Sequence, residues 1–240
     1  MLRHPDRSRR KFMGASGLVL GGGLLVAAAS CGKPIATAYG ADQGEQGEPK
    51  VTPPEDLMRE HGVLDRLLLI YESAIRKLSD GQDFDPSLLH DAAGIMRDFI
   101  HDYHEKSEEE QVFPRFKQRG QLVDLVDTLL RQHQAGRRVT ERILALAPTS
   151  RLDAGGRTQI VGSLQAFATM YRPHAAREDT VLFPKLKNVV SPNEYDAMAD
   201  DFEKKEHQQF GGDGFEMMVA KTASIEKALG IFDLNPFTPT

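Results

Sequence analysis

The sequence predicts an all-α protein, namely an antiparallel, up-down four-helix bundle with additional C-terminal helices. Four stretches of about 25 residues repeat apolar residues every three or four positions, which is the period of one helix face. Short connections containing Gly, Pro and Asp separate these stretches, as is typical of antiparallel neighbours in a bundle. No stretch alternates apolar and polar residues in the manner of a β-strand.

The domain organisation follows from shifts in composition along the 240 residues. Residues 1–31 have the character of an export signal, 32–53 of a flexible linker, 54–187 of the bundle, and 188–240 of a helical extension with a tail. The formal net charge is −5 and the bundle carries no basic stripe, which argues against nucleic acid as a partner. A single cysteine excludes an internal disulfide.

The N-terminus is predicted to direct export. Arg9 and Arg10 precede Phe12 and an uncharged run rich in Gly, Ala, Val and Leu, a pattern that resembles a twin-arginine signal for folded proteins. Cys31 ends an Ala-Ala-Ser-Cys run that resembles a lipobox, and it would then be the lipidated first residue of a membrane-attached protein. Cleavage after Ala38 and an uncleaved membrane anchor are the alternatives. Each of them places the body outside the cytoplasm, as a periplasmic or other extracytoplasmic protein.

The first helix is predicted to begin after Thr52, which forms a capping box with Glu55, and prolines occupy its first turn. The Asp80-Gly81 turn ends it. Its inward face consists of Leu57, His61, Leu64, Leu68, Tyr71, Ile75 and Leu78. His61 is therefore a polar residue on an otherwise mainly apolar face.

The second helix is predicted to begin at Asp85-Pro86, an N-cap followed by a first-turn proline. Its inward face consists of Leu89, Ala93, Met96, Ile100, His104, Glu108 and Val112. Pro114 is expected to interrupt this helix, because proline lacks an amide donor and clashes with the preceding turn. A turn at Gly120 closes it.

The third helix is predicted over 122–147, where Pro148 stops it, and the fourth is predicted to begin with a cap within 150–153. The inward face of the third helix consists of Leu122, Val126, Leu129, His133, Thr140 and Leu144. That of the fourth consists of Ile160, Leu164, Phe167, Tyr171, His174, Glu178 and Leu182. Pro173 is expected to kink or loosen the fourth helix directly before His174.

Two further helices are predicted after the bundle. Ser191 caps a fifth helix that reaches about Gln208, and a sixth runs from Gly214 to about Leu229. The tail from Asn235 onward is expected to be loose. These helices are expected to cover one end or side of the bundle.

A motif of the form H-x3-E-[ED]-x3-F-P occurs twice, at 104–114 and at 174–184. A His and a Glu four residues apart share one helix face and lie about 6 Å apart along its axis. Each copy is preceded, at a nearly equal separation, by a helix with one inward histidine. Two such halves facing each other bring four histidines and two glutamates to one layer of the core.

This polar layer predicts a metal site. A lone buried histidine is usually a hydrogen-bonded core residue, and a lone His/Glu pair is usually a surface helix pair. Six such groups buried together are strongly unfavourable unless a cation compensates them. Imidazole and carboxylate suit iron, manganese or zinc, and six ligand residues exceed the needs of one tetrahedral zinc. The set suits two ions bridged by the glutamates, as in carboxylate di-iron bundles, with the candidate ligands His61, His104, Glu108, His133, His174 and Glu178.

Residues 54–187 resemble the hemerythrin-like (HHE cation-binding) domain family. The resemblance rests on His61 after Glu60, on His133, and on the two motif copies that end in Phe-Pro. It implies a four-helix bundle with a non-haem di-iron centre that binds or senses O2 or NO, or that handles iron. In the oxygen-carrying hemerythrins a second histidine follows the third-helix histidine by four residues, and here that position is Arg137. Either Arg137 opens a coordination position and pairs with a carboxylate or bound anion beside the site, or it pairs with a nearby acid or extends to the surface.

Several further polar residues lie close in sequence to the candidate ligands or on the fifth helix. His101 is expected to be a partly exposed neighbour rather than a ligand, and Tyr171 to donate a hydrogen bond to a bound ligand or carboxylate, or to pack in the core. Glu109 and Asp179 follow the two glutamates and are candidates to accept hydrogen bonds from imidazole N–H groups. Asp179 could instead replace Glu178 as a ligand. His207 on the fifth helix is expected to lie on a solvated face.

Three functions are consistent with these observations. The first is a non-haem di-iron protein of the cell envelope that binds or senses O2, NO or a related small molecule. The second is a di-iron enzyme of iron or peroxide/NO chemistry, a ferroxidase or a reductase. The third is a structural helical protein with zinc or no metal. The sequence leaves open whether the protein is an enzyme.

Overall fold

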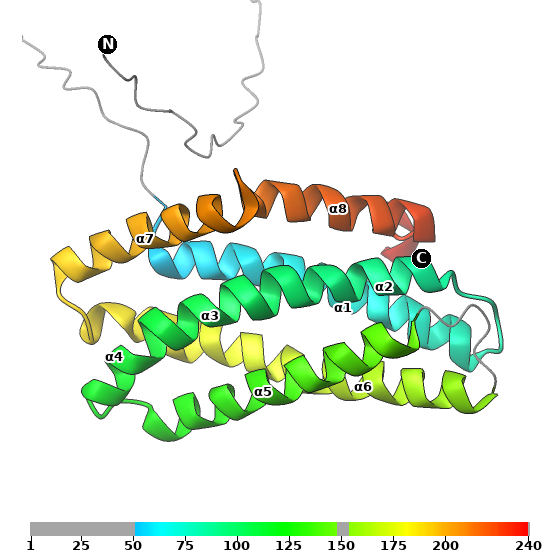
Figure 1. Cartoon of the computed structure of the whole chain (residues 1–240), viewed down its shortest axis with the longest axis horizontal. Helices are drawn as coiled ribbons and strands as arrows, with labels where there is room; N and C mark the ends of the chain where they lie inside the picture. Colours follow the sequence, from blue (N-terminus) through cyan, green and yellow to red (C-terminus); the bar gives the residue numbers. More distant parts are fainter. Residues whose placement is uncertain (1–50, 148–153, 240) are drawn as a thin grey trace, which may run out of the picture. The chain divides into compact units, whose positions relative to one another are not determined.

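The computed structural model describes residues 51–147 and 154–239, and within these ranges the chain is helical and contains no strand. The predicted all-α class is therefore confirmed (Figure 1). The predictions for the export signal, for Cys31, for most of the linker and for the cap of the fourth helix fall outside the described residues.

The helix starts follow the predicted caps. The first helix, α1 (Pro53–Ser79), begins with the reciprocal capping box of Thr52 and Glu55, in which each side chain meets the other residue's amide at 3.4 Å. The next helix, α2 (Pro86–Ile95), begins where the Asp85 carboxylate accepts a hydrogen bond from a backbone amide. These bonds satisfy amides that have no partner within the helix.

The second helical arm continues from α2 through two π-helical segments. The first is η1 (Met96–His104), which is followed by α3 (Glu105–Ser107), and the second is η2 (Glu108–Val112). A π-turn inserts an extra residue and so changes the direction of the side chains that follow it. The His104/Glu108 pair of the motif lies on these turns, which the 3.6-residue period of the sequence did not predict.

The prediction that Pro114 interrupts the second helix was wrong, because the helical path continues past this residue. The amide of Phe113 donates to the carbonyl of Glu108, five residues earlier, and Pro114 lies in the first turn of α4 (Phe113–Gln118). A proline needs no amide partner there, so the helical path continues past it. The second motif copy behaves alike: η3 (Glu178–Leu182) is a π-turn, and the 3-10 segment η4 (Phe183–Asn188) continues the path.

The third and fourth bundle helices are α5 (Val123–Leu146) and α6 (Ala154–Arg177). Leu122 precedes α5 in the left-handed region, with φ of 51°. The helix α6 continues as an α-helix through Pro173. The predicted inward faces of the four helices are buried, except that Ile75 and Leu122 are half-buried.

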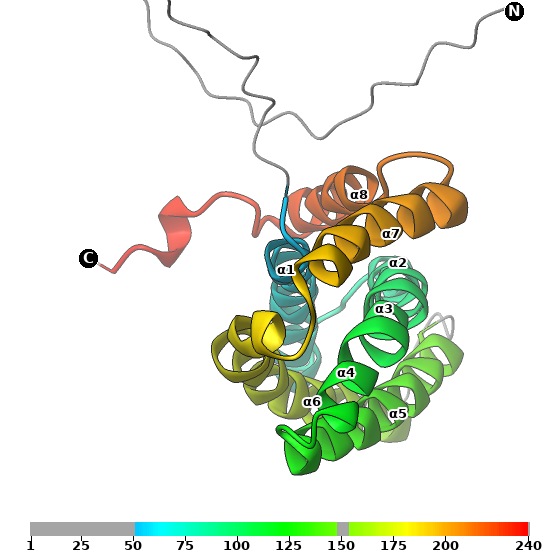
Figure 2. The same ribbon diagram turned by 90° about the vertical axis from the view of Figure 1, so that its left-hand side faces the viewer.

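The four arms form a closed ring of neighbours: α1 packs on α6, α6 on α5, α5 on α2 and η1, and these on α1. The additional helices α7 (Pro192–Phe210) and α8 (Gly214–Leu229) form a further layer, with α7 against α1 and α8 against α1 and α2 (Figure 2). They cover one side of the bundle, as predicted. In the tail, Asn235–Phe237 form an exposed 3-10 turn.

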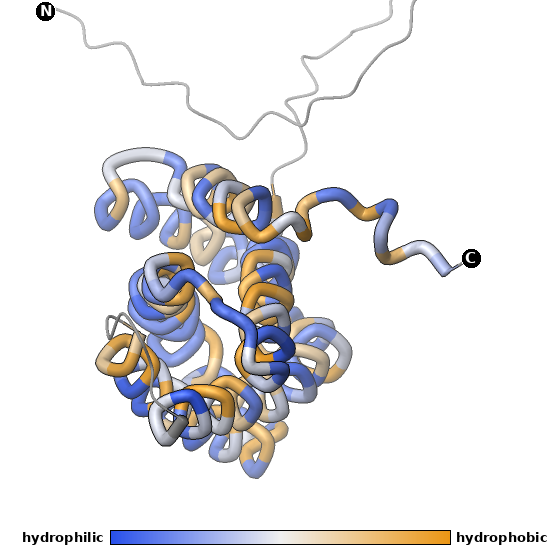
Figure 3. The backbone as a smooth tube through the Cα atoms, turned by 90° about the vertical axis from the view of Figure 1, so that its right-hand side faces the viewer, coloured by the Kyte–Doolittle hydropathy of each residue, from blue (hydrophilic) through white to orange (hydrophobic). Residues whose placement is uncertain are grey.

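The apolar core consists of two clusters with a polar layer between them. Figure 3 shows hydrophobic and hydrophilic residues interspersed along the helices. On α1 the polar layer lies between Leu57 of one cluster and Val63 of the other, and on α6 and η3 between Tyr171 and Leu182. Among the described residues, no helix combines the length and apolar character needed to span a bilayer.

Candidate metal centre

Four histidines, one from each arm of the bundle, meet in the polar layer. His61 on α1 faces His104 on η1, with 3.0 Å between their Nε2 atoms. His133 on α5 faces His174 on α6, with 3.2 Å between their Nε2 atoms. The predicted convergence of the four inward histidines is therefore found in the fold.

The outer nitrogen of each imidazole meets a hydrogen-bond acceptor. The Nδ1 atom of His61 lies 2.7 Å from Asp179, and that of His104 lies 2.7 Å from Glu60. The Nδ1 atom of His133 lies 3.1 Å from Glu109. A carboxylate accepts a hydrogen bond from the Nδ1-protonated tautomer, and in that tautomer each Nε2 presents a lone pair to the centre of the layer.

The fourth imidazole follows the same rule with a different acceptor, because the Nδ1 atom of His174 lies 2.9 Å from the amide oxygen Oε1 of Gln132. In each facing pair, the two Nε2 lone pairs then point at each other across about 3 Å. Such an arrangement is repulsive unless a proton or a cation lies between the rings.

Two glutamates complete the layer. Glu108 and Glu178 are fully buried, and none of their four carboxylate oxygens has a hydrogen-bond partner among the described residues. Glu178 Oε2 lies 3.1 Å from His174 Nε2 and 3.4 Å from His61 Nε2. Glu108 Oε2 lies 3.4 Å from His133 Nε2 and 3.7 Å from His104 Nε2. Each glutamate therefore reaches one histidine of each half, as bridging ligands would.

The buried groups of the layer shift one another's pKa values in opposite directions. Burial and the neighbouring Glu178 raise the pKa of Glu108 well above its usual value. Burial alone would lower the pKa of His61, but the neighbouring carboxylates of Asp179 and Glu178 outweigh it and raise the pKa to about 9. Burial and the charge on His61 lower the pKa of His104. Protons or cations must therefore be shared among these buried groups.

The donor atoms fit two cations. The side chains divide into two groups of three, His61/His104/Glu108 and His133/His174/Glu178, and within each group the potential donor atoms lie within 4.8 Å of one another. The six side chains are 0 to 4 % exposed. Imidazole and carboxylate donors suit iron, manganese or zinc. The unpartnered carboxylates and the converging lone pairs are what such ions would satisfy.

Arg137 lies beside this layer and points to acidic side chains. Its guanidinium forms ion pairs with Glu105 Oε2 at 2.9 Å and with Glu109 Oε1 at 2.8 Å, and it donates to the carbonyl of His101 at 3.2 Å. Glu105, Glu109 and His133 form a third group with metal-like spacing, and Arg137 supplies positive charge to it. Arg137 thus pairs with carboxylates beside the site, as both interpretations allow, and does not simply extend to the surface.

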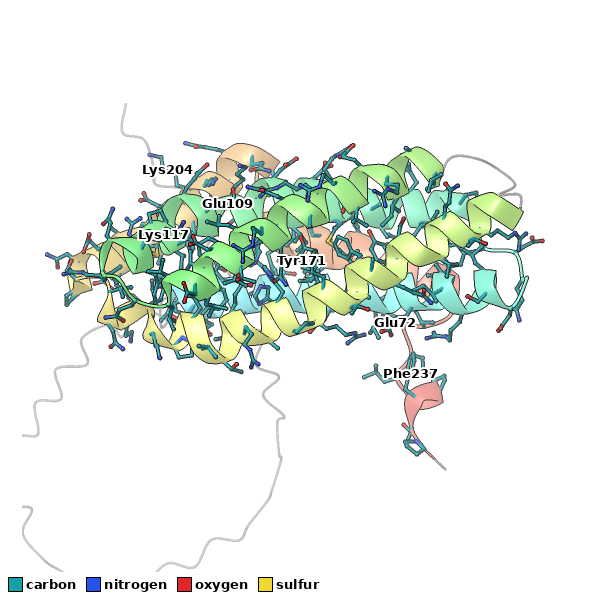
Figure 4. The ribbon with its side chains drawn as sticks, turned by 90° about the horizontal axis from the view of Figure 1, so that it is seen from below. Glu72, Glu109, Lys117, Tyr171, Lys204 and Phe237 are labelled. Atoms are coloured by element: carbon teal, nitrogen blue, oxygen red, sulfur yellow. The ribbon has the colours of Figure 1, made fainter. Side chains whose placement is uncertain are left out.

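Tyr171 also lies inside the bundle (Figure 4). Its hydroxyl donates to Glu105 Oε1 at 2.6 Å, and its ring stacks on Phe167 and lies 5.2 Å from the ring of His174. The predicted hydrogen bond to a carboxylate is thus present, but the carboxylate belongs to Glu105.

The expectation for His101 was wrong. Its side chain is only 1 % exposed, because Nδ1 bonds to Glu105 at 2.9 Å and Nε2 bonds to Thr140 at 2.8 Å. Both ring nitrogens are occupied, so His101 is a hydrogen-bonded core histidine. His207 on α7 is half-buried and lines a surface hollow with Asp200 and Glu203.

The structure places Glu109 and Asp179 as acceptors for imidazoles, as predicted, and Glu178 rather than Asp179 points into the layer. The acceptors Glu60 and Gln132 were not predicted. Both directly precede an inward histidine, and that shared position is the sequence signal that could have identified them.

A helical bundle with two His2Glu groups in its core defines a cation-binding helical domain. The family model described as Hemerythrin HHE cation binding domain matches residues 52–186, and the chain belongs to this family. Similar relatives are uncharacterized proteins of Mycobacterium bovis and of the CDC 1551 and H37Rv strains of Mycobacterium tuberculosis. Each is 44% identical over 220 residues, covering 91% of this chain and 86% of the relative. No solved structure matches the chain.

Proposed function

We propose that the bundle holds two non-haem iron ions and binds or senses O2, NO or a related small molecule. The observation that supports this most is the buried pair Glu108 and Glu178, whose oxygens have no hydrogen-bond partner among the described residues and face four imidazole lone pairs. Burying such groups without compensation would cost several kcal/mol, on the order of the penalties for unpaired buried charges. Six donors suit two ions better than one tetrahedral zinc.

The residues have separate roles in this proposal. The four histidines and two glutamates would hold the ions, and the Nδ1 acceptors fix the orientation of the rings. Iron held by these residues would supply redox-active binding of a diatomic ligand. Because the six side chains are at most 4 % exposed, the layer favours a small ligand over a bulky substrate. Arg137 and Tyr171 both bond to Glu105, so their role is to hold Glu105 in place beside the ligand histidines.

The proposal includes export to the cell envelope. The pair Arg9-Arg10 before an uncharged run supports a twin-arginine-type route, and Cys31 supports lipid attachment to the membrane. Export after folding would allow the ions to be loaded in the cytoplasm. Replacing both arginines by lysine should retain the protein in the cytoplasm, and Cys31→Ser should release it from the membrane fraction. Unchanged fractionation of both variants would contradict this part.

The test of the proposed function is metal analysis of the purified protein combined with Mössbauer or EPR spectroscopy. We expect two irons per chain and an optical spectrum that changes when O2 or NO is added. Glu178→Ala should lose iron, whereas Glu110→Ala, which changes a 59 % exposed glutamate, should keep both irons. Two irons with no response to either gas would contradict ligand binding.

The same experiment separates the alternatives. Catalytic consumption of ferrous iron or peroxide that is lost in Glu108→Ala would assign an enzyme instead. Zinc as the resident ion, or a folded protein that takes up no metal, would assign a structural role to the polar layer.

A further inference from the structure

The two halves of the metal centre are built alike except for one hydrogen-bond acceptor. In each half, the motif histidine bonds through Nδ1 to the residue that directly precedes the other histidine of that half. This residue is Glu60 for His104 and Gln132 for His174, at 2.7 and 2.9 Å. At the same position of the repeat, one half thus has a carboxylate and the other a neutral amide.

The second pair of acceptors differs in the same direction. Asp179 lies 2.7 Å from His61 Nδ1. Its counterpart Glu109 lies 3.1 Å from His133 Nδ1, and its carboxylate also bonds to Arg137 at 2.8 Å and to Lys106 at 3.1 Å. Two cations therefore draw on the negative charge of Glu109, whereas no such cation contact is present for Asp179 among the described residues.

Acceptors of this kind determine how strongly an imidazole donates to a metal. A carboxylate that accepts the Nδ1 proton pushes electron density onto the ring and makes Nε2 the stronger ligand, and an amide oxygen does so less. His61 and His104 both have short hydrogen bonds to carboxylates. His133 bonds to a carboxylate that also bonds to two cations, and His174 bonds to an amide oxygen.

We infer that the His61/His104 half binds its ion more tightly than the His133/His174 half, and that Gln132 determines most of the difference. This inference rests on the proposed two-ion function. It makes the centre an unequal pair, in which one position is filled first and the other is more readily emptied.

The experiment is stepwise addition of Co²⁺, a divalent probe that is stable to air at neutral pH, to the metal-free full-length protein in competition with a chromophoric chelator. We expect two dissociation constants that differ by about 10- to 100-fold, the range found when acceptors of ligand histidines are changed. Glu60→Gln should weaken the tighter event by a similar factor. Gln132→Glu should tighten the weaker event and bring the two constants together.

Three further variants test whether the difference in affinity arises from the acceptors and which half binds more tightly. Gln134→Glu adds the same charge on the exposed side of α5, two residues from Gln132, and should leave both constants within about twofold. His174→Ala should keep the tight event, whereas His104→Ala should keep only a weak one. Circular dichroism of each variant verifies that the helices are formed.

The outcomes separate this inference from the proposed function. Two Co²⁺ ions bound with equal constants in the unmodified protein would overturn the inference and leave the two-ion centre intact. Equal effects of Gln132→Glu and Gln134→Glu would also overturn it, because general charge would then suffice. A folded protein that takes up neither cobalt nor iron would overturn both.

Discussion

Arg137 shows how a single residue beside the site can be read from the structure but not from the sequence. Its side chain joins Glu105, which is 1 % exposed, to Glu109. Burial alone would lower the pKa of Arg137, but the charges of Glu105 and Glu109 outweigh it, so the guanidinium stays charged. It therefore acts as a fixed internal cation that compensates acids next to the ligands.

Removing this cation should destabilise the fold without removing the metal donors. Arg137→Ala leaves Glu105 buried without its ion pair, and we expect a loss of roughly 2–4 kcal/mol in the free energy of unfolding. Urea denaturation of the metal-free protein measures this loss, and the iron content of the variant should remain at two. Arg138→Ala, which changes the exposed neighbour, should have an effect below about 0.5 kcal/mol. Equal stabilities of the two variants would contradict this role.

Glu109 provides a pH-dependent test. Burial would raise its pKa, but the hydrogen bonds to His133, Arg137 and Lys106 outweigh burial and lower the pKa from 4.5 to about 2. Because the folded-state pKa is the lower one, the contribution of Glu109 is complete above about pH 4.5 and is lost as the pH falls toward 2.

We therefore expect metal-free Glu109→Gln to be less stable than the unmodified protein by about 2 kcal/mol at pH 6, with a smaller difference at pH 3. Urea denaturation at a series of pH values measures this difference. Glu110→Gln, at an exposed position, should match the unmodified protein throughout. If the loss of stability in Glu109→Gln instead grows as the pH falls, the predicted lowering of the Glu109 pKa is contradicted.

At the scale of the residue, the six candidate ligands could be predicted because each lies at a position where the helical period places it on the inward face. The roles of His101, Glu60 and Gln132 could not, because they depend on which neighbouring helix supplies a partner. A periodic pattern indicates the direction of a side chain but not the atoms that it meets.

At the scale of the elements, caps and prolines predicted where α1, α2 and α7 begin, and the π-turns were the part that the pattern could not predict. Both motif copies contain a π-turn that starts at the ligand glutamate. Its hydrogen bonds span five residues, so the chain gains a residue without leaving the helical path. Pro114 and Pro184 follow these turns and do not end the arms.

Gly136 of α5 lies close against Tyr171 of α6. A Cβ atom there would overlap the Tyr171 hydroxyl and lie 2.7 Å from two carbons of its ring. Gly136→Ala should displace Tyr171 from Glu105 and lower the free energy of unfolding by about 1–3 kcal/mol, as overpacking does. Thermal denaturation measures the change.

Gly162→Ala is the matched control, since a Cβ on this exposed residue of α6 would have no atom within 4 Å. It should stabilise the protein by about 0.5–1 kcal/mol, because alanine is the better helix former. Destabilisation by both substitutions would indicate that helix propensity, rather than the approach of Tyr171, determines the result.

At the scale of the whole molecule, the polar layer separates two apolar clusters that also draw on the C-terminal helices. Met198 and Phe202 of α7 belong to one cluster, and Met218 and Ile225 of α8 belong to the other. The bidentate bonding of Arg66 to Glu226 adds a polar tie between α1 and α8. The layer of α7 and α8 therefore supports the bundle on both sides of the proposed centre.

Because the six candidate ligands come from all four arms, metal occupancy should stabilise the molecule as a whole. Ions that bind only the folded chain stabilise it by mass action, by about 2.7 kcal/mol per site when the free ion is at 100 times its dissociation constant. Removing iron with a chelator should lower the thermal midpoint, and reloading with iron or zinc should restore it, since binding rather than redox chemistry is responsible. Glu178→Ala should lose this metal-dependent difference, whereas Glu110→Ala should keep it. Equal midpoints for iron-loaded and metal-free protein would show that the arms do not depend on the ions that they are proposed to share.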